Sequence, residues 1–275
     1  MVLPVGDINP TSRRAWVTGV FLALNAAVFL LVQLPLQGCE QVAFIYQWAA
    51  VPVELLRLEQ VPPDAIAARA GGCQVEVEKS IAASAVTSMF MHGSLGHLLV
   101  NLLFLWIFGA NVEDRLGHAR FVGFYLGGGL IATYAFALVN PSSTVPLLGA
   151  SGAIAAVLGA YLILYPRARV LTYVPFPLYL LALVLPGIRI RSFWLIFAIV
   201  TMPAWVLLTG WFVLQINAAQ SPTADGGVAY MAHAAGFVAG VLLLLMLDRR
   251  RRQRGQAPFH PPRSPRPGPG RSGWR

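Results

Sequence analysis

The chain has 275 residues, of which 57% are hydrophobic and only 11% are charged, and its mean hydropathy is +0.65. Soluble domains carry roughly 25% charged residues, so this composition excludes an ordinary soluble protein and indicates one that lies in a membrane. The net charge of +9 does not indicate nucleic-acid binding, because the basic residues form short clusters between apolar runs and one tail.

Apolar segments recur along the chain, and a bilayer crossing needs about 20 residues. A secretory signal is the competing interpretation for the first segment, but that segment exceeds the roughly 7–15 residues of a signal core, so a retained span is expected. In the fifth segment Pro203 predicts a kink. The expected spans are 15–34, 86–111, 121–139, 149–165, 193–216 and 228–247.

Residues 35–83 form the only long polar segment before the C-terminal tail, and we expect an outer loop with short helices here. The segment holds six acids against three basic residues, and the pairs Pro62-Pro63 and Gly71-Gly72 interrupt it. Both cysteines of the chain, Cys39 and Cys73, lie in it. A disulfide between them is one interpretation if the loop faces an oxidising compartment, and two free thiols are the other.

The connection 170–192 begins as an apolar run that is interrupted by prolines and flanked by arginine pairs. A crossing would place one arginine pair on the wrong side, so 170–187 is expected to lie in, or dip into, the cytoplasmic face of the membrane. After the last span, residues 248–275 form a basic tail rich in Pro, Gly and Arg that we expect to be disordered. The flanking pairs are Arg167 and Arg169, then Arg189 and Arg191.

The charge distribution gives the chain a direction in the membrane. With six spans and both termini inside, the outer loops hold three basic residues and seven acids, and the inside holds seventeen basic residues and four acids. This asymmetry satisfies the positive-inside rule. We therefore expect a multi-pass protein of a bacterial-type plasma membrane, with a cytoplasmic segment 1–14, a membrane domain 15–247 and a cytoplasmic tail.

Gly149-Ala150-Ser151-Gly152 is a flexible turn that carries one hydroxyl at the start of an apolar helical run. Serine becomes a nucleophile when a base removes its proton and hydrogen-bond donors receive the oxyanion that forms. The glycines let another backbone approach, and a helix N-terminus supplies unpaired N–H groups. Such a turn often does no more than start a helix, so its meaning depends on partners elsewhere in the chain.

The candidate partners are polar residues in apolar segments, where burial at membrane depth is costly and therefore indicates a function. His97 and Asn101 lie four residues apart and share a helix face, with His92 at the mouth of the same span. His233 lies near the outer end of the sixth span. Hydrogen bonds that only hold the bundle together are the alternative for His97 and Asn101, and a packed neutral histidine is the alternative for His233.

Small residues predict that the fourth and sixth spans pack closely, which places His233 within hydrogen-bond reach of Ser151 as a base beside a nucleophile. No Asp or Glu lies in the apolar core, so this pair predicts a dyad rather than a triad. His97 and Asn101 then serve as donors to the oxyanion, together with the Ser151 backbone N–H. The small residues on these faces are Gly236 and Gly240 beside His233, and Ala155 and Gly159 beside Ser151.

A metal site built from His92, His97 and His233 is the chemical rival of the dyad. No carboxylate accompanies these histidines, and the H-E-x-x-H pattern is absent from the sequence. We therefore expect no metal.

Across residues 85–247 the chain resembles the rhomboid intramembrane serine proteases. It departs from the pattern of some members by lacking a Trp-Arg pair between residues 35 and 83, and its 170–192 connection is expanded. The matching motifs are His92 upstream, H-x-x-x-N as His97-Leu98-Leu99-Val100-Asn101, G-x-S-G as Gly149-Ala150-Ser151-Gly152, A-H-x-x-G as Ala232-His233-Ala234-Ala235-Gly236, and the run Gly109-Ala110-Asn111-Val112-Glu113-Asp114-Arg115-Leu116-Gly117.

The resemblance implies an all-α, polytopic fold of six transmembrane helices in which Ser151 attacks a peptide bond and His233 acts as general base and then acid. It also implies an oxyanion site of His97, Asn101 and the Ser151 backbone N–H, with His92 as a further candidate. The implied partners are the lipid bilayer and single-pass membrane-protein substrates, which are cut in or near their span. The family needs no metal or cofactor, and no nucleic acid is implied.

Two other classes of function remain open. One is a catalytically inactive rhomboid-like protein that binds membrane clients, although such relatives generally lack the serine or the histidine, and both are present here. The other is a small-solute transporter, which would favour charges at mid-membrane and an inverted repeat. Neither feature is visible in the sequence.

Overall fold

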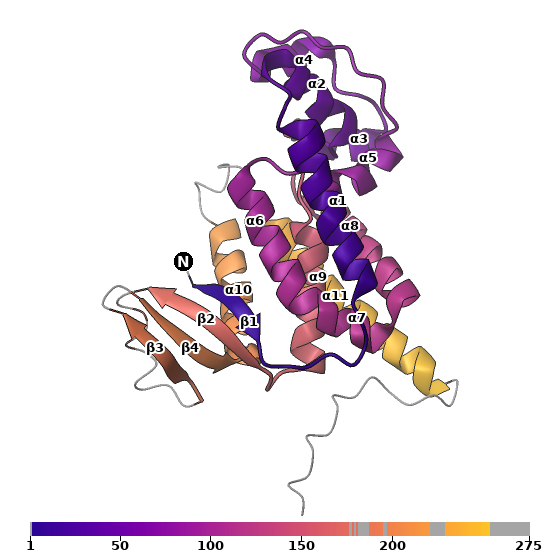
Figure 1. The fold of residues 1–275 in the computed structure, drawn as a ribbon. Helices are drawn as coiled ribbons and strands as arrows, with labels where there is room; N and C mark the ends of the chain where they lie inside the picture. The colour runs from indigo at the N-terminus through magenta and orange to yellow at the C-terminus, as the bar shows by residue number, and fades with distance from the viewer. Residues whose placement is uncertain are drawn as a thin grey trace, which may run out of the picture.

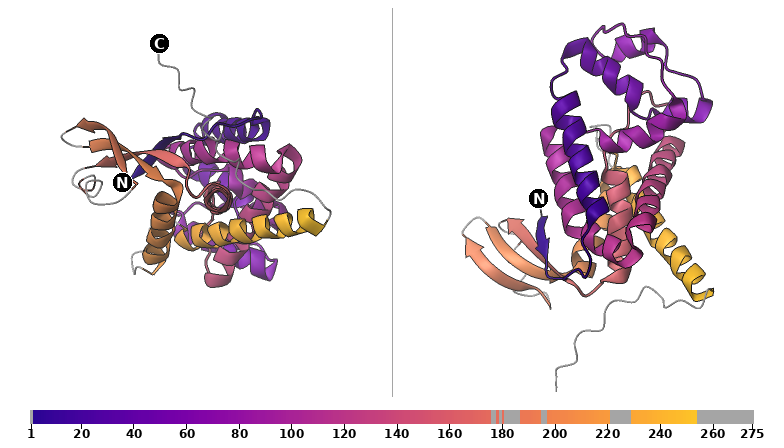
Figure 2. Two further views of the ribbon diagram at one scale, coloured as in Figure 1. Left: turned by 90° about the horizontal axis from the view of Figure 1, so that it is seen from below. Right: turned by 45° about the vertical axis from the view of Figure 1, so that its right-hand side comes forward.

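The computed structural model describes residues 2–175, 178, 180, 187–194, 197–220 and 229–253. In that part of the chain a helical bundle has a group of short helices at one end and a four-stranded sheet beside the other end (Figures 1 and 2). The bundle consists of α1 (Trp16–Ala27), the π-helical turn η1 (Val28–Gln33), α6 (Leu95–Phe104), the π-helical turn η3 (Leu105–Gly109), α7 (Ala110–Leu116), α8 (His118–Val139), α9 (Ser151–Leu164), α10 (Ala204–Ala219) and α11 (Tyr230–Gln253).

Four helical stretches among the described residues are long and apolar enough to cross a membrane: Trp16–Gln33, Leu95–Leu116, His118–Val139 and Tyr230–Asp248. The helices at the expected fourth and fifth spans are shorter, since α9 has 14 residues and α10 has 16. Helix α9 is the centre of the bundle, and all its residues from 153 to 161 are buried. Because α9 is surrounded by protein and not by lipid, it does not need the length of a helix that spans the bilayer alone.

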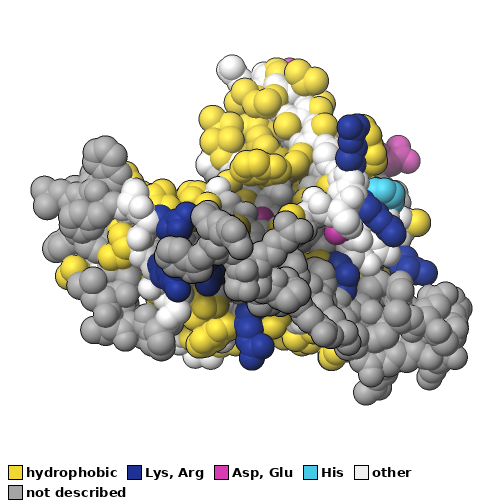
Figure 3. Space-filling view, turned by 60° about the horizontal axis from the view of Figure 1, so that its bottom comes forward, with side chains coloured by type: hydrophobic (Ala, Val, Ile, Leu, Met, Phe, Trp, Pro, Cys, Tyr) yellow, Lys and Arg dark blue, Asp and Glu magenta, His cyan; other side chains and the backbone are white. Residues whose placement is uncertain are grey.

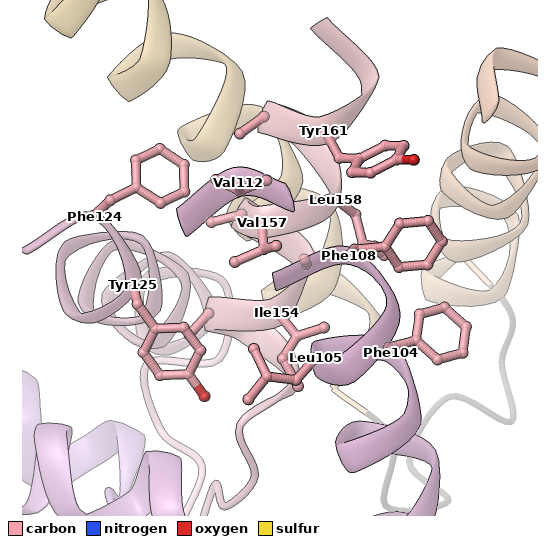
Figure 4. Packing of buried hydrophobic residues seen from close by; sticks show 14 of the residues in the cluster. Phe104, Leu105, Phe108, Val112, Phe124, Tyr125, Ile154, Val157, Leu158 and Tyr161 are labelled. Atoms are coloured by element: carbon pink, nitrogen blue, oxygen red, sulfur yellow. The ribbon is translucent and has the colours of Figure 1, made fainter. Parts of the chain in front are cut away.

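The core around α9 is filled by large side chains from both sides. Tyr161 of α9 packs edge-on against Phe108 of η3, with ring centroids 4.9 Å apart, and Ile154, Val157 and Leu158 lie in the same cluster (Figure 4). All of these side chains except Ile154 are completely inaccessible to solvent, and Ile154 is 3% exposed. This packing fixes the position of the helix that carries Ser151 at its first turn.

The acidic run after η3 anchors the start of α1. Glu113 accepts hydrogen bonds from the backbone N–H groups of Val17 at 2.9 Å and Thr18 at 2.7 Å, and from the Thr18 hydroxyl at 2.6 Å. These are N–H groups of the first turn of α1, which have no partner within the helix, and a carboxylate there also complements the helix dipole. The cap of α1 is thus supplied from a distant part of the chain.

The N-terminal segment is a strand, β1 (Leu3–Asp7), which pairs antiparallel with β2 (Arg169–Pro175). Asp7 ends this strand and accepts hydrogen bonds from Tyr161 Oη and Asn111 Nδ2, each at 2.8 Å. Burial raises the pKa of Asp7, and these two hydrogen bonds oppose the shift. The polar segment 1–14 is therefore tied to the far end of α9.

The expected all-α fold is wrong in one region, because the segments 169–175, 189–194 and 197–203 form a sheet with β1. The strand order is β1-β2-β4-β3, where β3 is Arg189–Trp194 and β4 is Phe197–Pro203, and all neighbouring strands are antiparallel. Alternating burial along β2 and many β-branched residues explain the strands. Basic side chains, among them Arg167, Arg189 and Arg191, are exposed at this end of the molecule (Figure 3).

Several expected boundaries are also corrected. The fifth span was expected at 193–216, but its first half is β3 and β4, and Pro203 precedes α10 at the N-cap instead of kinking a helix. The second was expected at 86–111, but the chain leaves the helix after Phe90 and starts α6 at Leu95. Helix α11 continues to Gln253, which makes the start of the expected disordered tail helical; residues 254–275 lie outside the described residues.

The segment 35–83 folds into short helices at the opposite end from the sheet (Figure 1). A disulfide joins Cys39 to Cys73, with the Cα atoms 5.3 Å apart, so the first of the two interpretations holds. Closing a loop of this size stabilises a fold by roughly 3–4 kcal/mol in the chain-entropy account. The helices are α2 (Gly38–Trp48), α3 (Pro52–Arg57), α4 (Pro63–Arg69) and α5 (Ile81–Thr87), and the 3₁₀ turn η2 (Ser88–Phe90) follows.

A buried ion pair joins the parts of this segment. Lys79 contacts Glu54 with both side chains almost fully buried, and its ammonium donates to the carbonyls of Tyr46 and Ala49 at 3.0 Å each. Glu54 also accepts from the N–H of Val61 at 2.9 Å. Burial lowers the pKa of Lys79, and Glu54 opposes that shift.

We expect Lys79→Ala to destabilise the protein by about 3–5 kcal/mol, because it leaves the Glu54 charge buried without an opposite charge. For a domain of this size the thermal unfolding midpoint in detergent should fall by roughly 10 °C. The exposed Glu59 on the same segment provides the control, and Glu59→Gln should leave the midpoint unchanged. A Lys79→Ala midpoint equal to that of the wild type would show that the pair is not part of the folded unit.

Candidate active site

Ser151 is the first residue of α9, preceded by a backbone turn that only glycine adopts easily. Gly149 has φ +128°, in the region that favours glycine, and its N–H donates to the Ser88 carbonyl at 2.9 Å. A Cβ at Gly149 would lie 2.7 Å from His97 Cε1 and 2.9 Å from His97 Nε2. The glycine is therefore required by its conformation and by the imidazole of His97 that packs on it.

The His97 ring is brought to this turn by the start of α6. The Ser94 hydroxyl caps that helix and accepts the N–H of His97 at 3.1 Å. His92, just before the cap, lies edge-on to His97 with ring centroids 5.2 Å apart. Its backbone exchanges hydrogen bonds with the Gln33 side chain at 2.9 and 3.1 Å, which links this corner to the end of η1.

Ser151 Oγ and His233 Nε2 are 2.7 Å apart, within hydrogen-bond distance. Close packing of α9 on α11 makes this contact possible. A Cβ at Gly236 would meet the carbonyl oxygen of Gly152, and a Cβ at Gly240 would meet that of Ala156. The small-residue faces expected from the sequence thus lie against each other, and the serine and the histidine meet at the same ends of the two helices.

Two polar side chains, one in α6 and one just before it, are buried without partners in the described part of the chain. Asn101 is 5% exposed, and its Nδ2 has no hydrogen-bond acceptor there. His92 is 2% exposed, and neither of its ring nitrogens has a partner there. Leaving a buried donor unpaired is costly, so such groups often mark a place where a ligand or water binds.

A narrow cavity opens beside Ser151 on the side that faces α8. Met89, Gly129, Ala132 and Thr133 contribute to its walls, together with the serine turn itself. Neither His97 nor Asn101 lines it. The side chains of His97 and Asn101 therefore lie outside this cavity.

One contact of His233 is not evident from the sequence motifs. Gln215 of α10 places its Oε1 2.8 Å from His233 Nδ1, and the ring of Trp211, one turn earlier, lies 6.1 Å from the imidazole. A signal was present, since Gln215 is an amide at the end of an otherwise apolar stretch. Gln215 lies 18 residues before His233 and outside every motif that contains the histidine.

Comparison with known families decides where this chain belongs. A family model described as the Rhomboid domain matches residues 81–250. The chain belongs to the rhomboid family. The matched region contains Ser151, His233, His97 and Asn101, and it leaves the N-terminal strand and most of the disulfide-bonded segment outside.

Relatives of this rhomboid occur in fungi, animals and plants. It is 31% identical to "Rhomboid protein 1, mitochondrial" of Saccharomyces cerevisiae over 182 residues, which are 63% of this chain and 45% of the yeast protein. It is 37% identical over 86 residues to "Presenilin-associated rhomboid-like protein A, mitochondrial" of Danio rerio, which are 30% and 22% of the two chains. It is 31% identical over 120 residues to "RHOMBOID-like protein 12, mitochondrial" of Arabidopsis thaliana, which are 37% and 36%.

These relatives correct the expected location. Each carries "mitochondrial" in its name, so the expectation of a bacterial-type plasma membrane with cytoplasmic termini is wrong. The error arose because arginine asymmetry divides the two sides of a membrane without naming the membrane. This rhomboid covers less than half of the length of each of the three relatives.

Proposed function

We propose that this rhomboid is an intramembrane serine endopeptidase, with Ser151 as nucleophile and His233 as general base. The observation that carries the proposal is the 2.7 Å contact between Ser151 Oγ and His233 Nε2. A nucleophile within hydrogen-bond reach of its base is the geometric condition for covalent catalysis by serine. Ser151 also lines a cavity, which a role in helix packing alone would not require.

The proposed reaction has two acyl-transfer steps. His233 Nε2 takes the proton of the Ser151 hydroxyl as Oγ attacks the substrate carbonyl, and the resulting imidazolium gives that proton to the leaving amine. Water then attacks the acyl-enzyme ester while His233 takes a proton from it and returns the proton to Ser151 Oγ. The products are two peptide fragments, and the chain regains its starting state.

We assign the oxyanion to three donors: Asn101 Nδ2, the His97 ring and the Ser151 backbone N–H. The unpartnered burial of Asn101 Nδ2 supports its role, because the donor gains an acceptor only when the oxyanion forms. The Ser151 N–H is at the first turn of α9, where helix N–H groups are free. His97 is positioned by its contact with Gly149, and His92, packed on His97, supports that ring.

The proposed substrates are single-pass membrane proteins that are cut in or near their span. A peptide carbonyl within a helix is already hydrogen-bonded, so a bond near helix-breaking residues is more accessible to Ser151. We place six spans in a membrane domain at 15–247, with the folded segment 35–83 on one side and the tail on the other. The names of the relatives support a mitochondrial membrane as the location.

Labelling with a fluorophosphonate tests the proposal, because only an activated serine reacts readily with it. We expect the detergent-solubilised wild type to be labelled and Ser151→Ala not to be labelled. Ser142 is an exposed serine in the loop before α9, so Ser142→Ala provides a matched control that should label like the wild type. A folded wild type that does not label would refute the protease and favour an inactive rhomboid that binds membrane clients.

A further inference from the structure

Both ring nitrogens of His233 have a partner. Nε2 lies 2.7 Å from Ser151 Oγ, and Nδ1 lies 2.8 Å from Oε1 of Gln215. The second partner comes from α10, a helix that packs along α11. The imidazole is thus held between two helices, with the serine on one side and an amide on the other.

The atom that contacts Nδ1 determines which tautomer His233 adopts. A neutral imidazole has one N–H donor and one bare acceptor nitrogen. The amide oxygen of Gln215 can only accept, so the contact requires the proton on Nδ1 and leaves Nε2 bare. A bare Nε2 is the form that can take the proton of the Ser151 hydroxyl.

The surroundings of Gln215 also fit an orienting contact. Its side chain is half-buried, and Trp211 one turn earlier on α10 packs against both His233 and Phe237, with ring centroids 6.1 Å apart in each case. The same face of α10 therefore covers the imidazole with an indole and bonds it with an amide. Free rotation of the His233 ring would break both contacts.

We propose that Gln215 is a positioning residue that holds His233 in the Nδ1–H tautomer, so that Ser151, His233 and Gln215 form an uncharged triad. The inference rests on the proposed function for its kinetic consequence, but the tautomer itself does not depend on catalysis. In other serine hydrolases a carboxylate orients the imidazole and adds a negative charge beside it. The amide of Gln215 would orient the ring without adding a charge.

The kinetic experiment compares three substitutions on α10 with a membrane substrate. Gln215→Met keeps the length of the side chain but removes the acceptor, so kcat should fall by about 3- to 10-fold with KM unchanged. Gln215→Glu restores an acceptor and adds a charge that favours the imidazolium, so kcat should recover and the acid limb of its pH profile should move to higher pH. Asn217 is an amide on the same helix whose Nδ2 donates to the Val213 carbonyl at 2.9 Å, so Asn217→Leu provides the control with no effect on kcat.

A second measurement reads the tautomer directly. The full chain with Ser151→Ala and ¹⁵N-labelled histidine should show His233 protonated at Nδ1 at neutral pH, with His233→Ala used to assign the signals. Adding Gln215→Met should produce a mixture of both tautomers. This arm remains decisive if Gln215→Met cleaves poorly because of impaired folding.

The outcomes separate the two proposals. If the wild type cleaves, Ser151→Ala does not, and Gln215→Met matches the wild type in kcat and pH profile, the positioning role is refuted while the protease stands. If the wild type does not cleave or label, the protease is refuted, and the ¹⁵N spectra still decide whether Gln215 sets the tautomer. An Nδ1 without a proton in the Ser151→Ala protein would overturn the inference.

Discussion

Ser151→Ala and His233→Ala should each lower the kcat for cleavage of a membrane substrate by at least about 10³-fold. The reason is the contact between Ser151 Oγ and His233 Nε2, since the serine is a weak nucleophile until the imidazole takes its proton. The double variant should be no slower than the worse single variant. Residues that act as one unit lose their joint contribution when either one is removed.

Cleavage of a co-reconstituted substrate in proteoliposomes measures this effect, with the thermal unfolding midpoint of each variant as a check on folding. Ser142→Ala again provides the control and should cleave like the wild type. A fall of only a few-fold in Ser151→Ala, with the fold intact, would show that another group attacks the peptide bond. Fully additive losses in the double variant would show that the two residues act in separate steps.

Gly240→Leu should lower kcat/KM by about 10²-fold or more, although Gly240 lies two helical turns from His233. A side chain at Gly240 would collide with the backbone carbonyl of Ala156, which cannot move aside as a flexible side chain could. The substitution therefore has to push α11 away from α9. A displacement of about 1 Å at a nucleophile and its base is sufficient for a loss of this size.

Glycines of the same bundle provide the comparison. Gly127 on α8 has open space where a Cβ would be, so Gly127→Ala should retain wild-type activity and stability. Gly236→Ala meets the carbonyl of Gly152 and should behave like Gly240→Leu. If Gly240→Leu cleaves normally and unfolds at the wild-type temperature, close approach of the two helices is not what brings the serine and histidine together.

Most residues of the candidate site could be predicted because they are polar and lie in apolar segments. Ser151, His97, Asn101 and His233 are polar residues in apolar segments, and the motifs around them are recognisable in the sequence. The glycine faces predicted which helices meet, and the structure has those faces in contact. Gln215 has the same polar character but no motif around it, and only the folded position of α10 shows that it reaches the imidazole.

The fold was less predictable where an apolar run could be either a membrane span or a set of buried strands. The run 193–216 is long enough for a span, yet it divides into strands β3 and β4 and the helix α10. A continuous apolar run does not distinguish a buried strand from a buried helix. The strand pairing depends on partners far away in the chain, since Leu3 pairs with Tyr173.

The sequence by itself determined that this protein lies in a membrane, that it is a rhomboid, and which residues carry its candidate chemistry. The membrane location follows from composition, and the family and candidate residues follow from the resemblance of local motifs to those of the rhomboids. Only the tertiary structure decided that Glu113 caps α1, that strands β2, β3 and β4 form a sheet with the N-terminal strand β1, and that Gln215 bonds His233. Each of these is a contact between distant segments, and its geometry exists only once the helices have packed.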